Sequence, residues 1–564
     1  MAVFSVVLGV AAMLATMILI QLRGILKAYR SPLSRIPGPW YAPLTTMHLR
    51  WGFSTGEIWK LVERSHKAYG PIVRLGPRQV WVADKDALKE ILVKVDLPKV
   101  AMYSEISRDK HSPGLFGEIR YEPHKRLKRF LSPAFTVAYI DNLEKYFQKT
   151  MRELLNKYES QMNADPGAVS FNGIEVDLMD DLHNVALDIM GECSFGKGFG
   201  QTNPKTSVVE EGVDEKVWKS IPRSIFDGLS KRYQMVYVKK FLRMFGLDVN
   251  FDWPAEMITA IDAVVQRRRT NTLTAGEKAT EEAYRDEPEV AEKQQQQQQQ
   301  QTSRRDLLQH LIEEGKKPDS GTAMNTRDIV DQMAEILLAG SETTSGTIAC
   351  LFLELARNAD VRAKLLASLP ARGAGDEVVA SKAICSDAGQ YWYLEACIKE
   401  NLRLHPIASE MGRRTGKDWV TIMGYDLPPH TVVSASYRDL HRNEKYWPEP
   451  LRFWPERWLP EGQRDGAPAA DMNAYYPFSA GKHSCIGINF AWAEMRMVAA
   501  NIFSRFDIEE VPGQVIDFRQ YITMQFHTGN WRVVLRPRSR PAPPAASKSD
   551  DKNQGEKQET LIEA

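Results

Sequence analysis

The stretch with the clearest chemical purpose is a loop of small residues around Cys485, which leads directly into an apolar run, Ile488 to Ala500, predicted to be a helix. A thiolate just before a helix N-terminus is stabilised by the unpaired N–H groups and the dipole of that helix. Gly481 and Gly487, on either side of the cysteine, allow a tight turn in which several N–H groups point at the sulfur. His483 adds a cationic or hydrogen-bonding group nearby. This arrangement suits a charged sulfur that binds a metal; a buried structural thiol and a redox-sensing thiol are the alternatives.

Phe478, which would shield one side of the sulfur, completes the pattern F-x-x-G-x-[RH]-x-C-x-G. This pattern resembles the haem-binding loop of the cytochrome P450 family. The resemblance implies that the chain binds haem b, that Cys485 is the axial thiolate of the iron, and that Phe478, Gly481, His483 and Gly487 surround it. The family usually has arginine where this chain has His483, so a permanent positive charge near the haem becomes a titratable one.

A second chemical pattern interrupts the longest helical stretch, Thr326 to Ala356, with the sequence Ala339-Gly340-Ser341-Glu342-Thr343-Thr344. A glycine inside a helix costs roughly 1 kcal/mol relative to alanine, and neighbouring threonines crowd the turn. Ala339 and Thr343 are four residues apart and share one face. A Gly-Ser kink in a core helix is the alternative to a functional face.

The same A-G-x-E-T-T sequence resembles the matching cytochrome P450 signature. The resemblance implies that the Ala339 face crosses the distal side of the haem and that Gly340 leaves room for O₂. It also implies that the Thr343 hydroxyl and the Glu342 carboxylate deliver the protons that splitting of the O–O bond requires.

Two further segments resemble the parts of the family that hold the haem propionates. His124 and Lys128 share one face of a basic helical stretch, and they occupy the positions of a W/H-x-x-x-R pair. Lys128 there offers a point charge without the bidentate fork of arginine, and a solvated helix is the alternative. After His405-Pro406, Arg414 resembles the family arginine that meets a propionate, with Arg413 as the neighbouring alternative.

An acid–base pair, Glu400 and Arg403, lies three residues apart in an otherwise apolar helix, and Arg457 follows in a Pro-Glu-Arg sequence. A buried ion pair needs further partners, and Arg457 could complete the set. These residues resemble the E-x-x-R and P-E-R elements of the family, which implies a structural role behind the haem.

Composition argues against several classes of function. The net charge of +1 gives no reason to expect nucleic acid, and five cysteines without a C-x-x-C pair argue against a disulfide scaffold, a zinc module or an iron–sulfur centre. Met1 to Ile20 carry no charged side chain. This apolar stretch is just long enough for a helix that crosses a bilayer core, which takes about 20 residues. Basic residues follow this run and none precedes it, so the bulk of the chain is expected on the cytosolic side. A cleaved signal peptide is the alternative.

The predicted organisation is a transmembrane anchor at 1–22, a basic and proline-rich hinge at 23–40, a catalytic domain at 41–537 and a disordered tail at 538–564. A disordered insertion, which contains eight glutamines, is expected at 270–304. Alternation predicts a hairpin over 72–83, with Asp84 capping the next helix, and a buried helix is expected within 176–199. The fold class is mainly α with small β-sheets, that of the cytochrome P450 fold behind a single N-terminal transmembrane helix.

The resemblance covers about Pro37 to Arg536. It implies a monooxygenase in the endoplasmic reticulum membrane that uses O₂ on a lipophilic small molecule. No Gly-rich nucleotide motif stands out, so electrons are expected from a separate NADPH-cytochrome P450 reductase. The chain is most similar in character to fungal microsomal members of secondary metabolism, which suggests a terpenoid, polyketide or indole-derived substrate. The alternatives are a haem-thiolate isomerase or dehydratase that needs no reductase, and a membrane-tethered haem sensor; the intact Glu342-Thr343 pair counts against both.

Overall fold

The computed structural model describes residues 22–105, 107, 112–164, 173–205, 207, 212–234, 238, 242–247, 253–282, 306–317, 319–373 and 375–538, together with residues 16 and 19. The predicted anchor at 1–22, the glutamine run and the tail after Arg538 therefore lie almost wholly outside the described residues.

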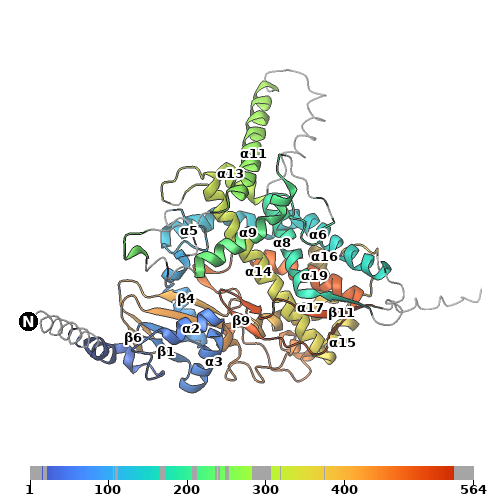
Figure 1. The fold of residues 1–564 in the computed structure, drawn as a ribbon. Coiled ribbons are helices and arrows are strands. Elements are labelled where there is room, and N and C mark those ends of the chain that lie inside the picture. Colours follow the sequence, from blue (N-terminus) through green and yellow to red (C-terminus); the bar gives the residue numbers. More distant parts are fainter. Residues whose placement is uncertain are drawn as a thin grey trace, which may run out of the picture.

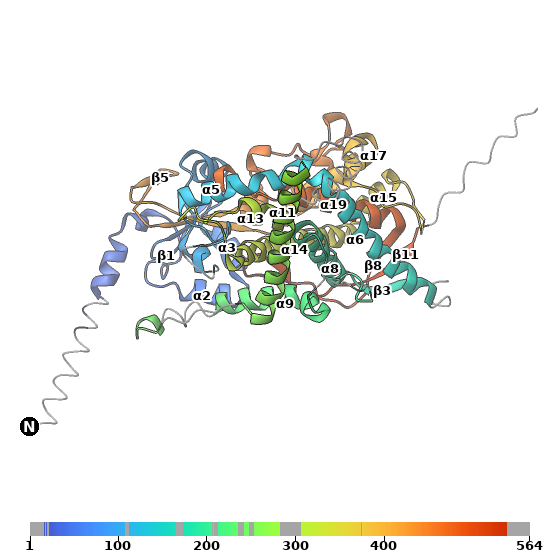
Figure 2. The same cartoon turned by 90° about the horizontal axis from the view of Figure 1, so that it is seen from above.

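One long helix, α14 (Thr326–Arg357), crosses the middle of the molecule (Figures 1 and 2). Asn325 and Asp328 begin it with a reciprocal capping box, in which each side chain accepts from the backbone N–H of the other residue. Its most extensive partner is α8 (Leu178–Phe195), which ends at the left-handed Gly196. Among the described residues α14 is also the one helix apolar and long enough to cross a bilayer, yet most of that apolar stretch is buried inside the domain. It is a core helix, as its all-round apolar character requires.

The other helices surround this axis. They are α2 (Met47–Thr55), α3 (Ile58–Tyr69), α4 (Lys85–Lys89), α5 (Tyr121–Leu131), α6 (Val137–Ala164) and α9 (Glu215–Gln234). The chain continues through α11 (Ala255–Glu282), α13 (Leu307–Glu314), α15 (Ala359–Ser368), α16 (Ser381–Ser386), α17 (Ala388–Leu404), α18 (Tyr437–His441) and α19 (Ile488–Arg505). Helix α11 extends to Glu282, so residues 270–282 of the insertion predicted to be disordered are helical, and the remainder lies outside the described residues.

Short strands form small sheets beside the helices. The largest has the order β1 (Ile72–Gly76), β2 (Gln79–Val82), β7 (Val432–Ser436), β4 (Glu410–Arg414). The predicted hairpin β1–β2 and the Asp84 cap of α4 are confirmed. A second sheet has the order β3 (Ile174–Asp177), β11 (Arg532–Pro537), β8 (Phe506–Glu510). Two-stranded pairs join β9 (Phe518–Gln520) to β10 (Met524–Phe526) and β5 (Val420–Ile422) to β6 (Tyr425–Leu427). The expectation of a mainly α fold with small sheets is met.

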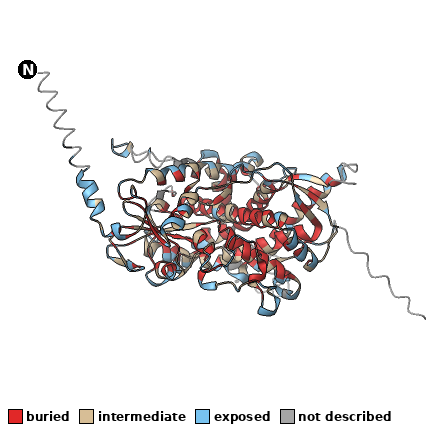
Figure 3. Cartoon of the chain, turned by 90° about the horizontal axis from the view of Figure 1, so that it is seen from below, coloured by how far each residue is buried: buried red, intermediate tan, exposed pale blue. Residues whose placement is uncertain are grey.

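Burial follows this division (Figure 3). A large apolar cluster joins α6, α8, α14, α17 and α19, and a smaller one underlies the four-stranded sheet. By contrast, residues 22–29 form exposed helical turns outside the body. The central helices are therefore a rigid frame in which polar side chains are costly unless they have partners.

The predicted set of Glu400, Arg403 and Arg457 is such a partnered group. Arg403 binds Glu400 through two parallel hydrogen bonds of 2.9 and 2.8 Å, and Arg457 lies 3.4 Å from the same carboxylate; all three side chains are 0% exposed. The Glu400 carboxylate also accepts from the Trp454 backbone and the Trp458 indole, each at 3.0 Å. Arg403 reaches the carbonyls of residues 441, 450 and 452. The set thus ties α17 to the segment that leads to the cysteine loop.

Replacing Glu400 by Gln should lower the free energy of unfolding by about 3–5 kcal/mol, because Arg403 and Arg457 would remain buried without their anion. Urea unfolding measures this loss, and the same variant should retain little haem. Glu510→Gln is the control: it removes the partner of the half-exposed Arg357 and should cost well under about 1 kcal/mol. Equal losses in the two variants would contradict the structural role of Glu400.

Candidate active site

The cysteine loop is fixed on one side by the chain that follows α4. Gly481 has a φ of +70°, and a Cβ there would meet the Leu92 carbonyl oxygen at 2.0 Å, so no other residue fits. The Cys485 N–H donates to the Phe478 carbonyl at 3.0 Å. Helix α19 begins directly after Gly487, as predicted, and the Gly487 N–H donates to the Cys485 sulfur. Gly487 has an ordinary φ, so of the two glycines only Gly481 is required by the turn, in which Ser479 also has a positive φ of 60°.

The Cys485 side chain is exposed, whereas Cys193, Cys350 and Cys397 are buried. Burial nevertheless raises the pKa of the Cys485 thiol, with the Gly487 N–H and the Lys128 charge opposing that rise. A cationic metal bound to this sulfur would favour the thiolate outright.

Basic side chains gather beside this cysteine from separate parts of the chain. They are Lys99, His124, Lys128, Arg413 and His483, here called the basic cluster. The rings of His124 and His483, which were predicted as haem-binding residues from separate motifs, lie 4.4 Å apart, so the two residues belong to one site. Lys128 donates to the carbonyls of Lys482 and Ser484 at 2.9 and 2.7 Å, and to the Ser484 hydroxyl at 3.1 Å.

The basic cluster holds buried donors that the described chain leaves without acceptors. Arg413 is 0% exposed, and none of its three side-chain nitrogen atoms has a hydrogen-bond partner among the described residues. Neither ring nitrogen of the buried His483 has one. Burial and the neighbouring cations lower the pKa of His483 to about 3 and that of His124 to about 2. Such a group needs an anion, and the two carboxylates of a haem fit it.

The arginine in this cluster differs from the predicted one. Successive residues of a strand point to opposite faces of a sheet, and in β4 Arg413 faces the buried side while Arg414 is partly exposed. Arg413 contributes to the pKa values of both Lys128 and His483, so it lies among them. The prediction for Arg414 is replaced by one for Arg413.

The accessible face of α14 contains Ala339 and Thr343, as their spacing predicts. Ala339 is exposed although it lies midway along a core helix, and Thr343 is half-buried. The Thr343 hydroxyl donates to the Ala339 carbonyl at 2.6 Å. The Glu342 carboxylate accepts from Gln525 and lies 4.0 Å from the His183 imidazole, so it points toward α8 and β10. The acid and the alcohol are therefore adjacent in sequence, with separate partners.

Gly340 packs against a neighbouring helix. A Cβ at this position would meet the Met190 sulfur at 2.5 Å, so the glycine lets α14 lie close to α8. Its expected role of leaving room for O₂ stays a prediction. Sequence reasoning missed Lys99, His183 and Gln525. A detectable signal existed only for Lys99, the single charged residue in the otherwise apolar stretch Leu97 to Tyr103.

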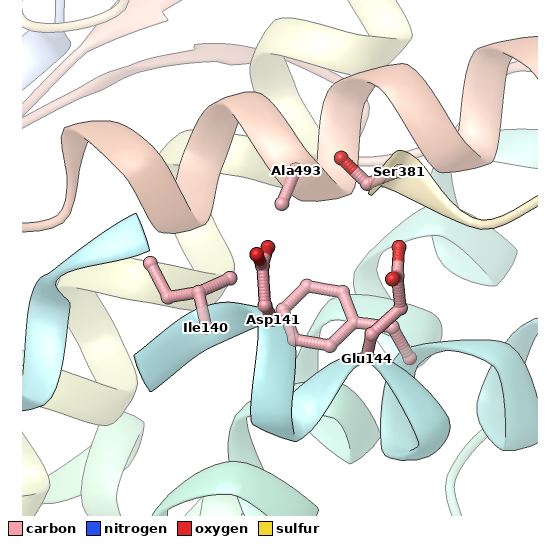
Figure 4. Close-up of a pocket in the computed structure, with 6 residues that line it drawn as sticks. Ile140, Asp141, Glu144, Ser381 and Ala493 are labelled. Atoms are coloured by element: carbon pink, nitrogen blue, oxygen red, sulfur yellow. The ribbon is translucent and has the colours of Figure 1, made fainter. Parts of the chain in front are cut away.

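A separate small pocket lies between α6, α16 and α19 (Figure 4). Asp141 and Glu144 point into it from α6, opposite Ser381 and Ala493. It contains none of the predicted site residues, and Glu144 already accepts from the Lys382 N–H at 2.8 Å.

Comparison with known proteins finds one matching family model and several similar proteins with related names. Residues 36–526 match the family model described as Cytochrome P450. The chain is 30% identical over 496 residues to "Cytochrome P450 monooxygenase LUC2" of a Fusarium species, with 87% of this chain and 86% of the relative covered. It is 29% identical to "Cytochrome P450 monooxygenase acrD" of Aspergillus aculeatus, with 86% and 87% covered. A third relative, "Cytochrome P450 monooxygenase sthF" of Phaeosphaeria nodorum, is 27% identical.

The assignment of Arg413 is testable against its neighbour. Arg413→Leu should weaken haem retention by roughly ten- to a hundredfold, since a charge-assisted hydrogen bond contributes about 1.5–3 kcal/mol. Arg414→Leu should leave retention near that of the wild type. The rate of haem transfer to an excess of apomyoglobin measures retention. Faster loss from the Arg414 variant than from the Arg413 variant would reverse the assignment.

Proposed function

The chain belongs to the cytochrome P450 family, and from this premise we propose that it is a monooxygenase which inserts one atom of O₂ into a lipophilic small molecule and reduces the other to water. The family consists of haem-thiolate enzymes with cysteine-ligated iron. The observation that carries the proposal for this chain is the accessible Cys485 thiol beside a basic cluster in which Arg413 and His483 have no side-chain hydrogen-bond partner among the described residues. Relatives that cover most of the chain carry monooxygenase names.

The accessible thiol and the unpartnered donors support an assignment of the residues that would hold the haem. Cys485 would bind the iron, and the basic cluster would bind the two carboxylates, with Arg413 as the main donor. Phe478 and His483 complete the surroundings of the loop. When bound, the haem supplies the activation of O₂.

Proton delivery falls to α14. Thr343 holds its proton toward the Ala339 carbonyl, on the accessible face of the helix, and can turn the hydroxyl toward a ligand there. Glu342 lies one position earlier and contacts His183, whose side chain is 27% exposed. His183 therefore offers Glu342 a route to solvent protons, and Glu342 can pass them to the Thr343 hydroxyl through water.

The remaining elements of the proposal concern the setting of the enzyme. We place the domain on the cytosolic face of the endoplasmic reticulum, held by a single-pass anchor at 1–22, on the strength of the apolar run and the basic residues that follow it. Electrons come from NADPH-cytochrome P450 reductase. The substrate is a bulky apolar intermediate of fungal secondary metabolism, of terpenoid, polyketide or indole-derived type.

Product formation should require NADPH, the reductase and O₂. Metabolite profiling of a strain with the gene disrupted identifies the substrate as the compound that accumulates. With that substrate, O₂ enriched in heavy oxygen should place one heavy atom in the product. Turnover without a reductase would instead indicate an isomerase or dehydratase, and absence of turnover in a haem-loaded protein would indicate a sensor.

Thr343→Ala should divert reducing equivalents from product to hydrogen peroxide. General acid catalysis contributes about 100-fold or more, so product per NADPH should fall by at least about tenfold while NADPH is still consumed. The neighbouring Thr344→Ala, altered on a buried side of the same helix, is the control and should remain coupled. Unchanged coupling in the Thr343 variant would remove this hydroxyl from the mechanism.

A further inference from the structure

A buried carboxylate on α14 lies outside the chemistry described so far. Glu335 precedes Ala339 by four residues and Thr343 by eight, so the three residues follow one stripe of the helix. Its carboxylate accepts from the backbone N–H groups of Phe116 and Gly117 at 2.8 and 3.2 Å, and from the Ser107 hydroxyl at 3.2 Å. Two consecutive N–H groups on one oxygen form an anion-binding backbone turn.

A second side chain of α14, Gln332, binds the backbone just before this turn. Gln332 accepts from the Leu115 N–H at 3.2 Å and donates to the Pro113 carbonyl at 3.2 Å. The backbone of residues 113–117, here called the wall segment, is thus bound to α14 at successive residues by two side chains. Both side chains are buried, so water does not compete with these bonds.

Two glycines in the wall segment make this approach possible. A Cβ on Gly114 would lie 2.2 Å from a Glu335 carboxylate oxygen, and one on Gly117 would lie 1.8 Å from the Ser107 hydroxyl and 3.0 Å from the other carboxylate oxygen. Glycine at these two positions therefore leaves the space that the Glu335 carboxylate and the Ser107 hydroxyl occupy. A helix that merely packed against a loop would not require glycine at both points.

A basic side chain, that of Lys99, binds the carbonyl groups of the wall segment. Lys99 donates to the carbonyls of Leu115 and Phe116, each at 3.0 Å, and is itself buried. Burial lowers the pKa of Lys99 to about 7, and the neighbouring Arg413 acts in the same direction while Glu335 opposes it. Because Lys99 also belongs to the basic cluster, the wall segment lies between that cluster and the accessible stripe of α14.

The wall segment occupies a place where a substrate would meet it. One helical turn, about 6 Å for four residues, separates its anchor at Glu335 from the exposed Ala339. Leu115 and Phe116 are half-buried, and the Phe116 ring packs edge-to-face on Tyr103 at 5.1 Å. These side chains offer an apolar surface at the N-terminal end of the stripe.

We infer that Glu335 and Gln332 are positioning residues for the substrate: they hold the wall segment against α14 so that Leu115 and Phe116 form a fixed side of the binding space for a bulky apolar molecule. This inference rests on the proposed function. Substrate specificity would then depend on residues that do not touch the substrate, because they set where the wall lies.

The test uses the haem-loaded full-length protein and two azoles whose nitrogen binds haem iron, read from the shift of the haem absorption band. Imidazole is small and reports on the iron alone, whereas clotrimazole also fills the space around it. Glu335→Leu should raise the dissociation constant for clotrimazole on the order of tenfold, the loss expected when one apolar side chain no longer packs on a ligand. Its dissociation constant for imidazole should not change.

Further variants separate positioning from general destabilisation. Glu335→Gln keeps an acceptor oxygen for the two N–H groups and should restore most of the clotrimazole affinity. Gln332→Leu should weaken clotrimazole in the same direction, and it provides the test if Glu335→Leu does not fold. Asp188→Leu is the matched control: this buried carboxylate holds the N–H groups of Phe199 and Thr202 at 2.8 and 2.7 Å, and its loss should leave clotrimazole binding unchanged.

Hydrogen exchange measured by mass spectrometry supplies the structural readout. In Glu335→Leu, the amides of residues 115–117 should exchange at least about tenfold faster, while the control should show faster exchange only over residues 199–202. Unchanged exchange in the Glu335 variant would overturn the anchoring. Faster exchange with unchanged clotrimazole affinity would overturn the claim that the segment borders the binding space. A wild-type protein that gave no haem shift with either azole would instead overturn the proposed function.

Discussion

Buried basic side chains that lack acceptors within the described part of the chain are the central constraint on this structure. Among the described residues, no side-chain nitrogen atom of the buried Arg413 has a hydrogen-bond partner, and Lys99 and Lys128 donate to backbone carbonyls and a hydroxyl. Leaving such groups buried and unpaired costs several kcal/mol of folding free energy, so a stable fold needs an interaction that offsets this cost. The proposed haem would offset this cost, since its carboxylates would pair with these basic side chains and its iron would bind Cys485.

Helix α14 connects this ligand site to the rest of the molecule. Its N-terminal half fixes the wall segment through Gln332 and Glu335, its centre presents Ala339 and Thr343, and Gly340 allows it to lie against α8. On the opposite side, the buried Glu400 and Arg403 of α17 secure the segment that leads to the cysteine loop. A helix held along its N-terminal half and its centre can keep a hydroxyl in place for proton transfer.

Local patterns predicted much of this arrangement. The glycine-flanked cysteine before α19, the long helix α14, the hairpin β1–β2 and the Glu400–Arg403 pair each depend on residues close together in the sequence, and the structure has them as expected. His124 and His483 are distant in sequence, yet they were brought to one site by the family resemblance alone.

The sequence could not predict which side of an element faces the interior, or which residues of other elements it contacts, because tertiary packing decides both. The choice between Arg413 and Arg414 depends on which face of β4 is turned toward the interior. The role of Gly340 depends on Met190 of another helix, and that of Glu335 on backbone N–H groups that carry no sequence signature.

The absorption spectrum of the purified protein, reduced and exposed to carbon monoxide, tests the central claim most directly, with Cys485→His as the comparison. The account predicts the strongly red-shifted Soret band of thiolate-ligated haem in the wild type and its loss in the variant. A wild-type protein without haem, or with the spectrum of nitrogen-ligated haem, would contradict the account.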